Sequence, residues 1–198
     1  MKRNDVQQKR AQVEELVQSR GAQAIPALVE LLSHQSWTLR ESAADALAAM
    51  GPGSVSAVLP LARSGLWYSR AGAAKVLGAV GGSDAIPVIV EMLFEDNRTV
   101  RAAAADALAQ VCRRGGGSAV ARGVYGRATA ERDSALLALD AAEEGLAEKI
   151  RRLLTDTQLM TVRDDTGESW EQSEGRGGGL VWEVLTGGKQ TPPGPPQG

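Results

Sequence analysis

Small and apolar residues recur along this chain with a period of 30 or 31 residues. In each period an arginine is followed three residues later by an alanine and seven residues later by a leucine. The arginines are Arg40, Arg70, Arg101 and Arg132, the alanines are Ala43, Ala73, Ala104 and Ala135, and the leucines are Leu47, Leu77, Leu108 and Leu139. Positions three, four and seven apart share one face of a helix. The pattern therefore predicts four copies of one helix, one in each structural repeat.

A second helix is predicted upstream of each of the first three copies, and a weaker one, AVARGVYGRA with two glycines, upstream of the fourth. The stretches AIPALVELL, beginning at Ala24, and AIPVIVEML, beginning at Ala85, carry apolar residues at i, i+3, i+4 and i+7. Such a stripe is typical of an amphipathic helix packed on one side. Glycines at 21, 51 and 81 are expected to cap the ends of the arginine-bearing helices. Pro60 is expected to shorten or kink the helix that contains it.

The pattern divides the chain into three parts. Residues 1–20 are expected to form a polar capping helix, roughly Asp5 to Ser19, which serves as a half-repeat. Residues 21–154 hold about four two-helix units and a terminal helix, with RRGGGS (113–118) as a longer, flexible joint. Residues 155–198 form an acidic, Gly/Pro-rich extension. Its sequence predicts a strand, a turn at Asp165–Gly167 and a further strand, followed by the β-prone segment LVWEVL.

Two states of this extension remain open from the sequence. The strands could form a small β-hairpin or meander, or they could stay disordered until a partner supplies a sheet edge. The final segment, TPPGPPQG, is typical of a disordered or polyproline end. We expect the extension to be partly disordered, with its order weak or dependent on a partner.

The repeats resemble the short HEAT-like repeats of bacterial proteins, a kind also found in phycobilin lyase-type proteins. The residues that carry the likeness are AIPALVELL with LRESAADALAAMG, and AIPVIVEMLFEDNRTVRAAAADALAQ. The resemblance implies an all-α, right-handed HEAT-like α-solenoid. It also implies that acidic residues of the loop within a unit face the arginine of a neighbouring unit, which this chain allows only near Asp96.

Composition favours a soluble protein without a catalytic or cofactor site. The formal net charge is −2 and there is one cysteine, Cys112, so no internal disulfide can form. The first residues lack the apolar core of a signal peptide. We therefore expect a cytoplasmic protein that carries no cofactor.

His34 is the one histidine of the chain, and it lies near Ser33, Ser36 and Ser42. A serine triad would need it as the base, but no glycine-rich elbow accompanies it. A zinc or iron site would need several converging His, Cys or carboxylate ligands. HEAT-like deoxyhypusine hydroxylases use His-Glu pairs, which are absent here. We therefore expect a non-enzyme, with His34 as a polar loop residue.

Two alternative functions remain open. HEAT-like DNA glycosylases grip phosphates on a basic face, and Arg113, Arg114, Arg122 and Arg127 form a local basic cluster. However, residues 21–154 hold fourteen basic and fourteen acidic side chains, so a general phosphate-binding field is not expected. The resemblance to phycobilin lyase-type proteins gives the second alternative, an accessory subunit of a cofactor-attachment system.

A repeated aromatic position favours surface recognition instead. Trp37 and Trp67 each stand three residues before a repeat arginine, Tyr68 adjoins the second, and Arg98 takes the third equivalent place. Tryptophan, tyrosine and arginine are enriched at interface hot spots. The alternative is that the indoles cover neighbouring loop backbones.

The extension adds two candidate contacts, because Trp170 and Trp182 stand in otherwise polar or Gly-rich sequence. Taken together, the sequence predicts a non-enzymatic scaffold or assembly subunit. Its partner-binding candidates are Trp37, Trp67, Tyr68, Arg98, Trp170 and Trp182.

Overall fold

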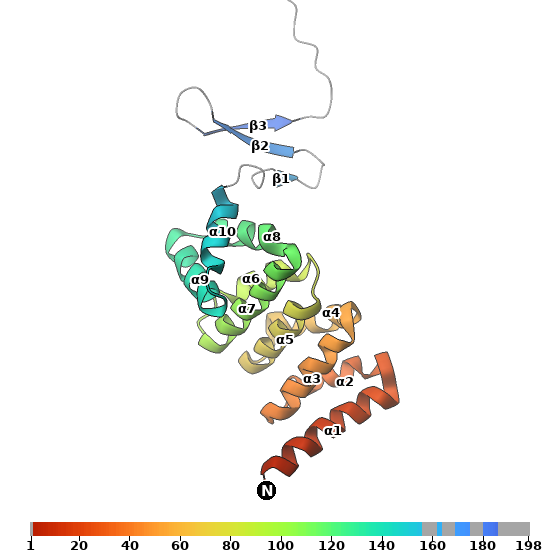
Figure 1. The fold of residues 1–198 in the computed structure, drawn as a ribbon. Helices are drawn as coiled ribbons and strands as arrows, with labels where there is room; N and C mark the ends of the chain where they lie inside the picture. Colours follow the sequence, from red (N-terminus) through yellow and green to blue (C-terminus); the bar gives the residue numbers. More distant parts are fainter. Residues whose placement is uncertain (1, 156–161, 164–168, 175–179, 186–198) are drawn as a thin grey trace, which may run out of the picture. The chain divides into compact units, whose positions relative to one another are not determined.

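The computed structural model describes the chain over residues 2–155, 162–163, 169–174 and 180–185. The chain divides into two units, Met1–Leu153 and Leu154–Gly198. In chain order the helices are α1 (Lys2–Arg20), α2 (Ile25–Leu31), α3 (Trp37–Ala49), α4 (Val55–Ser64), α5 (Trp67–Val80), α6 (Ala85–Met92), α7 (Arg98–Val111), α8 (Gly117–Tyr125), α9 (Thr129–Ala142) and α10 (Leu146–Thr155) (Figure 1).

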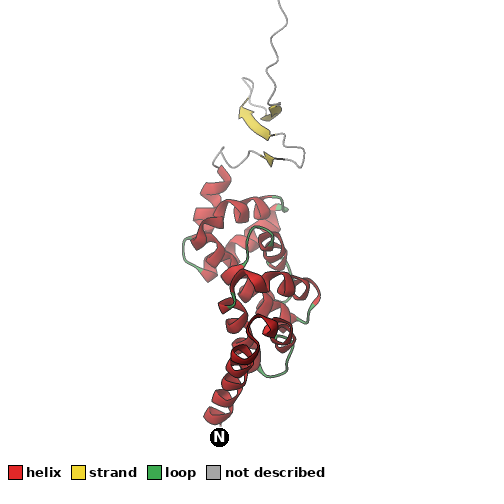
Figure 2. Ribbon diagram, turned by 90° about the vertical axis from the view of Figure 1, so that its right-hand side faces the viewer, coloured by secondary structure: helices red, strands yellow, loops and turns green. Residues whose placement is uncertain are grey.

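The helices of the first unit form two layers. Each repeat is a pair, α2 with α3, α4 with α5, α6 with α7 and α8 with α9. The first members of the pairs pack on one another in one row, and the second members form the other row (Figures 1 and 2). The structure is therefore an all-α solenoid, as the thirty-residue period predicts.

The repeated small and apolar residues form the core between these layers. Ala43, Ala73, Ala104 and Ala135 are buried, as are Leu47, Leu77, Leu108 and Leu139. Alanine at the first set lets the helices of adjacent repeats approach closely, while leucine fills the space between layers. The sequence pattern thus identified the buried face of each second helix correctly.

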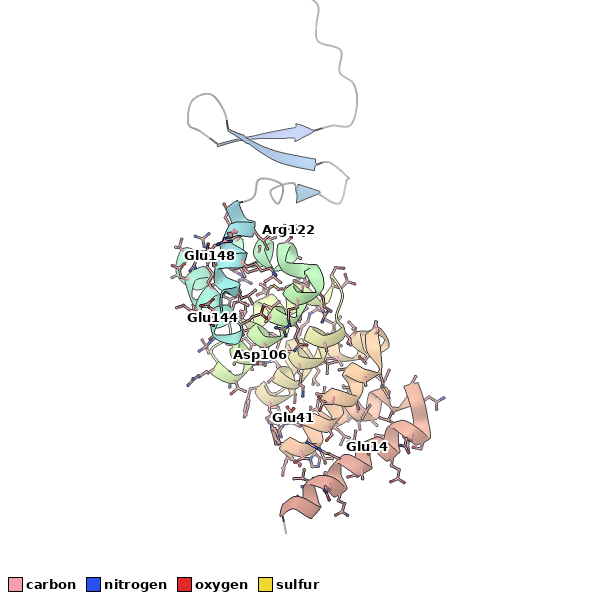
Figure 3. All side chains as sticks on the ribbon, viewed as in Figure 1. Glu14, Glu41, Asp106, Arg122, Glu144 and Glu148 are labelled. Atoms are coloured by element: carbon pink, nitrogen blue, oxygen red, sulfur yellow. The ribbon has the colours of Figure 1, made fainter. Side chains whose placement is uncertain are left out.

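Helix α1 ends the stack at the N-terminal side by packing on α3. Its Val13 is buried, whereas Glu14 is exposed at the position where the next repeats bury Ala44 and Ala74 (Figure 3). A polar residue fits there because, within the described residues, no helix of this row lies before α1 to cover that position.

The glycines that follow three of these helices do not all cap them in the same way. Gly21 and Gly51 have φ values of 53° and 74°, the left-handed conformation of a glycine cap. Gly81 caps α5 with φ −65° and ψ 140°, which is extended. A Cβ at Gly81 would lie 2.4 Å from the Leu77 carbonyl oxygen, so glycine is needed there for space rather than for its backbone angle.

Two local expectations differ from the structure. Pro60 lies inside α4 without shortening it, since α4 at 10 residues is longer than α2 or α6, and the expected kink stays a prediction. The joint after α7, Cys112–Gly116, is a kink between two helices with non-helical backbone angles at Gly115, and it leads directly into α8. Gly115 permits this kink through its φ of 93°.

The second unit contains an antiparallel sheet in the order β1-β2-β3. Its strands are β1 (Val162–Arg163), β2 (Ser169–Glu174) and β3 (Leu180–Leu185). Val162 pairs with Trp170, and Gln172 pairs with Trp182. The strands correspond to the meander, one of the two states that the sequence leaves open, and whether their order depends on a partner stays a prediction. The predicted turn at 165–167 and the proline-rich end lie outside the described residues.

Candidate binding groove

The repeat arginines fix the loops that precede the helices of the second layer. Arg40 donates to the carbonyl oxygens of His34 (2.8 Å) and Gln35 (2.9 Å). Arg101 donates in the same way to the carbonyl oxygens of Glu95 (2.6 Å) and Asp96 (2.8 Å). Backbone carbonyls without an intrahelical partner after one helix thus accept hydrogen bonds from an arginine in the first turn of the next helix. These arginines therefore bond the backbone of the loops that precede their own helices.

An ion pair joins one repeat arginine to the loop of the next repeat. The Arg70 guanidinium pairs with the Glu95 carboxylate of the next repeat. The expected acidic contact is therefore present in the FEDNR loop, but it is made by Glu95. Asp96 instead contributes its backbone carbonyl to Arg101.

Trp37 and Trp67 begin α3 and α5, and both indoles remain accessible. Trp37 is 65% exposed and Trp67 is 46% exposed. The Trp67 ring meets Tyr68 edge-on, with 5.3 Å between ring centroids, and the Arg40 guanidinium lies 4.7 Å from the centroid of Tyr68. This contact chain holds the second aromatic pair against the first repeat, while much of each indole surface remains uncovered.

The two indoles and Tyr68 line one groove of about 720 Å³ on the outer face of the second layer. Its floor is made of small residues from α5 and α7, namely Ala71, Gly72, Ala102, Ala103 and Ala107. This volume is in the range of ordinary ligand sites, and the small side chains let a ligand approach the helix backbones. The aromatic residues singled out from the sequence therefore border a shared concave surface.

Charged side chains border the same groove. Lys75 of α5 contacts Glu41 (2.6 Å) and Asp45 (2.7 Å), both on α3. Partial burial lowers the pKa of Lys75, but its hydrogen bonds to Asp45 and Glu41 outweigh that effect and raise the pKa. Arg113, beyond the end of α7, pairs with Glu143.

Arg98 occupies the expected position but does not line this groove. It begins α7 as Trp37 and Trp67 begin their helices. Its side chain borders a smaller adjoining hollow of about 230 Å³ between α7 and α9. The two concavities share Ala102, Asp106 and Ala142. The structure thus brings together three of the four predicted solenoid contacts and places the fourth beside them.

The groove also contains residues that the sequence did not single out. Small residues were assigned to packing between layers, and those that line the groove were not separated from them. Ala71 and Ala102 lie two residues before the buried Ala73 and Ala104, and Ala107 is itself buried. The register could have found Asp106, because residues 45, 75, 106 and 137 are equivalent and read Asp, Lys, Asp, Leu.

The residues considered for catalysis or metal binding make ordinary structural contacts. His34 is exposed, and its Nδ1 accepts a hydrogen bond from the Ser36 backbone (2.9 Å). Ser33 instead bonds to Ser69 of the next repeat. Cys112 is buried, and burial raises the pKa of its thiol, which disfavours the reactive thiolate. Within the described residues, no group of three His, Cys, Asp or Glu side chains could hold a metal ion.

The arginine cluster after α7 is largely engaged within the protein. Arg114 donates to the carbonyl oxygens of Gly78, Ala79 and Gly81 at the end of α5. Arg127 pairs with Glu91 and stacks on Phe94, and Arg113 pairs with Glu143. Three of the four arginines are therefore committed to contacts within the solenoid, which argues against a free basic surface for phosphates.

Comparison with known families agrees with this architecture. Residues 24–54 match the HEAT repeat family, and residues 55–147 match the family of HEAT repeats. The chain belongs to the HEAT-repeat proteins, a class whose solenoids generally serve in protein interaction. No curated protein and no solved structure matches the chain. The narrower likeness to phycobilin lyase-type proteins stays a prediction.

No helix in the described part of the chain is both long and apolar enough to cross a bilayer. Trp170 and Trp182 lie in β2 and β3, and their role in partner binding stays a prediction.

Proposed function

We propose that this chain is a non-enzymatic interaction module that holds a protein partner in the groove of α3, α5 and α7. The observation that carries the proposal is the position of Trp37 and Trp67, two exposed indoles on the rim of a concave surface with an alanine floor. Exposed aromatic residues next to a concavity are typical anchors of protein interfaces. Arg40 and Arg101 bond the loops before α3 and α7, so a partner would meet a preorganised surface.

The proposal requires that partner capture depend on the indoles and not on exposed apolar surface in general. The full-length chain, the double variant Trp37→Ala/Trp67→Ala and the control Leu137→Ala would be used as baits in an extract of the source organism. Leu137 is 72% exposed on α9 and lies outside the groove lining. We expect a protein that is retained by the wild type and by the control but lost by the double variant.

Thermal melting separates recognition from packing in this experiment. Because both indoles are substantially exposed, the double variant should lose no more than about 2 kcal/mol of stability. A photo-crosslinking residue introduced at Ala102, an exposed position in the groove floor, should capture the same partner, whereas the same residue at Leu137 should not. Equal retention by all three baits, or crosslinking from Leu137 alone, would overturn the proposal.

A further inference from the structure

Asp106 is a carboxylate in the groove that the protein itself leaves uncompensated. It is an exposed residue of α7, labelled in Figure 3. It borders both the main groove and the adjoining hollow. Within the described part of the chain, no hydrogen bond or ion pair engages its side chain. A group placed at the junction of two concavities is well situated to meet a ligand that enters either one.

The repeat register explains why Asp106 has no cation of its own. The equivalent residue in the preceding repeat is Lys75, whose ammonium is held by two carboxylates of α3, Glu41 and Asp45. The equivalent residue in the following repeat is Leu137, which carries no charge. Neither neighbouring repeat therefore supplies a counter-charge.

The remaining cations of the groove are also engaged elsewhere. Arg40 is bonded to loop carbonyls and lies over the Tyr68 ring, and Arg113 pairs with Glu143. When the direct partners are included, three cations and four carboxylates lie in or beside the groove. They are Arg40, Lys75 and Arg113, with Glu41, Asp45, Asp106 and Glu143. The adjoining hollow that Asp106 also borders adds Arg98 and Arg101, of which Arg101 is bonded to the loop carbonyls of Glu95 and Asp96, so the two concavities together carry no negative excess. Asp106 is set apart because, among the described residues, no ion pair engages its carboxylate.

We infer that the groove receives a segment of a partner protein that presents an arginine or lysine to Asp106, beside apolar side chains that pack on the indoles. This inference rests on the proposed function and names the chemistry of its partner. An Arg or Lys stem can lie along the alanine floor while its charged end reaches the carboxylate. Arginine can also stack on an exposed indole. Complementary charge would then set the register of the bound segment and speed its association.

The experiment is a selection of a random peptide library, displayed on phage, against the immobilised full-length chain. Parallel selections use Asp106→Asn, which keeps the shape of the side chain, and the control Asp133→Asn, an exposed aspartate of α9 outside both concavities. We expect the wild type and the control to enrich peptides with a basic residue beside apolar or aromatic ones. Asp106→Asn should lose the basic preference.

A selected peptide, synthesised and labelled, gives the quantitative test. We expect it to bind Asp106→Asn about tenfold more weakly than the wild type, with the difference shrinking at high salt. Replacing the basic residue of the peptide by alanine should weaken binding to the wild type but have little further effect on Asp106→Asn. Equal losses on both proteins would contradict the pairing.

The two proposals fail in different ways. Peptides that bind the wild type and lose binding to Trp37→Ala/Trp67→Ala, but carry no basic preference, would overturn the role of Asp106 alone. Peptides that bind equally well to the double indole variant would show that the groove is not the binding surface, which overturns both proposals. A library from which nothing is enriched would also count against both.

Discussion

At the scale of single residues, the stack depends on positions where no side chain can be accommodated. Gly78 lies in α5 where this helix packs against α7, and a Cβ there would lie 2.5 Å from the Cα of Ala107. The obstacle is backbone, so it cannot move aside by a change of rotamer. The repeat register aligns Gly78 with Ala48 and Ala109, and this alignment gives no warning that only glycine fits.

Gly78→Ala should therefore destabilise the solenoid although alanine is the better helix former. We expect a loss of about 1–3 kcal/mol from overpacking, in spite of the gain in helix propensity. The measurement is chemical denaturation followed by circular dichroism. Gly53→Ala is a suitable comparison, because a Cβ at Gly53 meets nothing within 4 Å. Equal midpoints for Gly78→Ala and the wild type would show that α5 and α7 can separate at little cost.

At the scale of elements, the helices and their buried faces were predictable, whereas their ends were predictable only in part. The apolar spacing identified most helices of the repeats because burial on one side imposes the same period in each, whereas the polar α1 was placed by the repeat register. The ends depend on single contacts across repeats, which a local pattern does not show. The extended end of α5 is the clearest case, since its last carbonyls are satisfied by Arg114, thirty-three residues beyond Gly81.

Arg114→Ala should weaken the C-terminal end of α5 more than Arg113→Ala does. Arg114 donates to Ala79 (2.8 Å) and Gly81 (3.2 Å) as well as to Gly78, and its loss leaves three carbonyls to solvent. Because the side chain is exposed, we expect a loss of about 1 kcal/mol.

Amide hydrogen exchange measures this directly, with faster exchange expected over the last turn of α5. Arg113→Ala is the matched control, because Arg113 makes an ion pair with Glu143 but no contact with α5 carbonyls. Faster exchange in α5 in both variants, or in neither, would show that Arg114 does not hold this helix end.

At the scale of the whole solenoid, the two-layer architecture follows from the period, but the groove does not. The sequence located Trp37 and Trp67 at equivalent positions, and this was enough to place them at equivalent helix starts. Whether the intervening surface is hollow depends on small residues such as Ala71 and Ala102, two positions before the buried Ala73 and Ala104, and the sequence pattern alone does not separate them from the packing residues. The uncompensated charge of Asp106 likewise depends on which way Lys75 turns.

The same two-layer logic makes α1 necessary at the N-terminal end. Since α1 packs on α3 and buries Val13, a chain beginning at Gly21 would expose the apolar side of α3. Burial of a side chain such as Val13 is worth about 1.5–3 kcal/mol. We expect the melting temperature to fall by roughly 3–12 °C, because 1 kcal/mol corresponds to about 2–4 °C in a chain of this size.

The truncated chain should also self-associate, because an uncapped repeat face is complementary to the face of another uncapped stack. Light scattering coupled to size-exclusion chromatography, measured over a range of concentrations, would detect this. A chain lacking only residues 1–5 is the control, since it removes polar surface and the exposed Lys9–Asp5 ion pair but keeps Val13 in place. If the chain beginning at Gly21 stayed monomeric with an unchanged melt, α1 would be an appendage, and the solenoid would effectively begin at the first complete repeat.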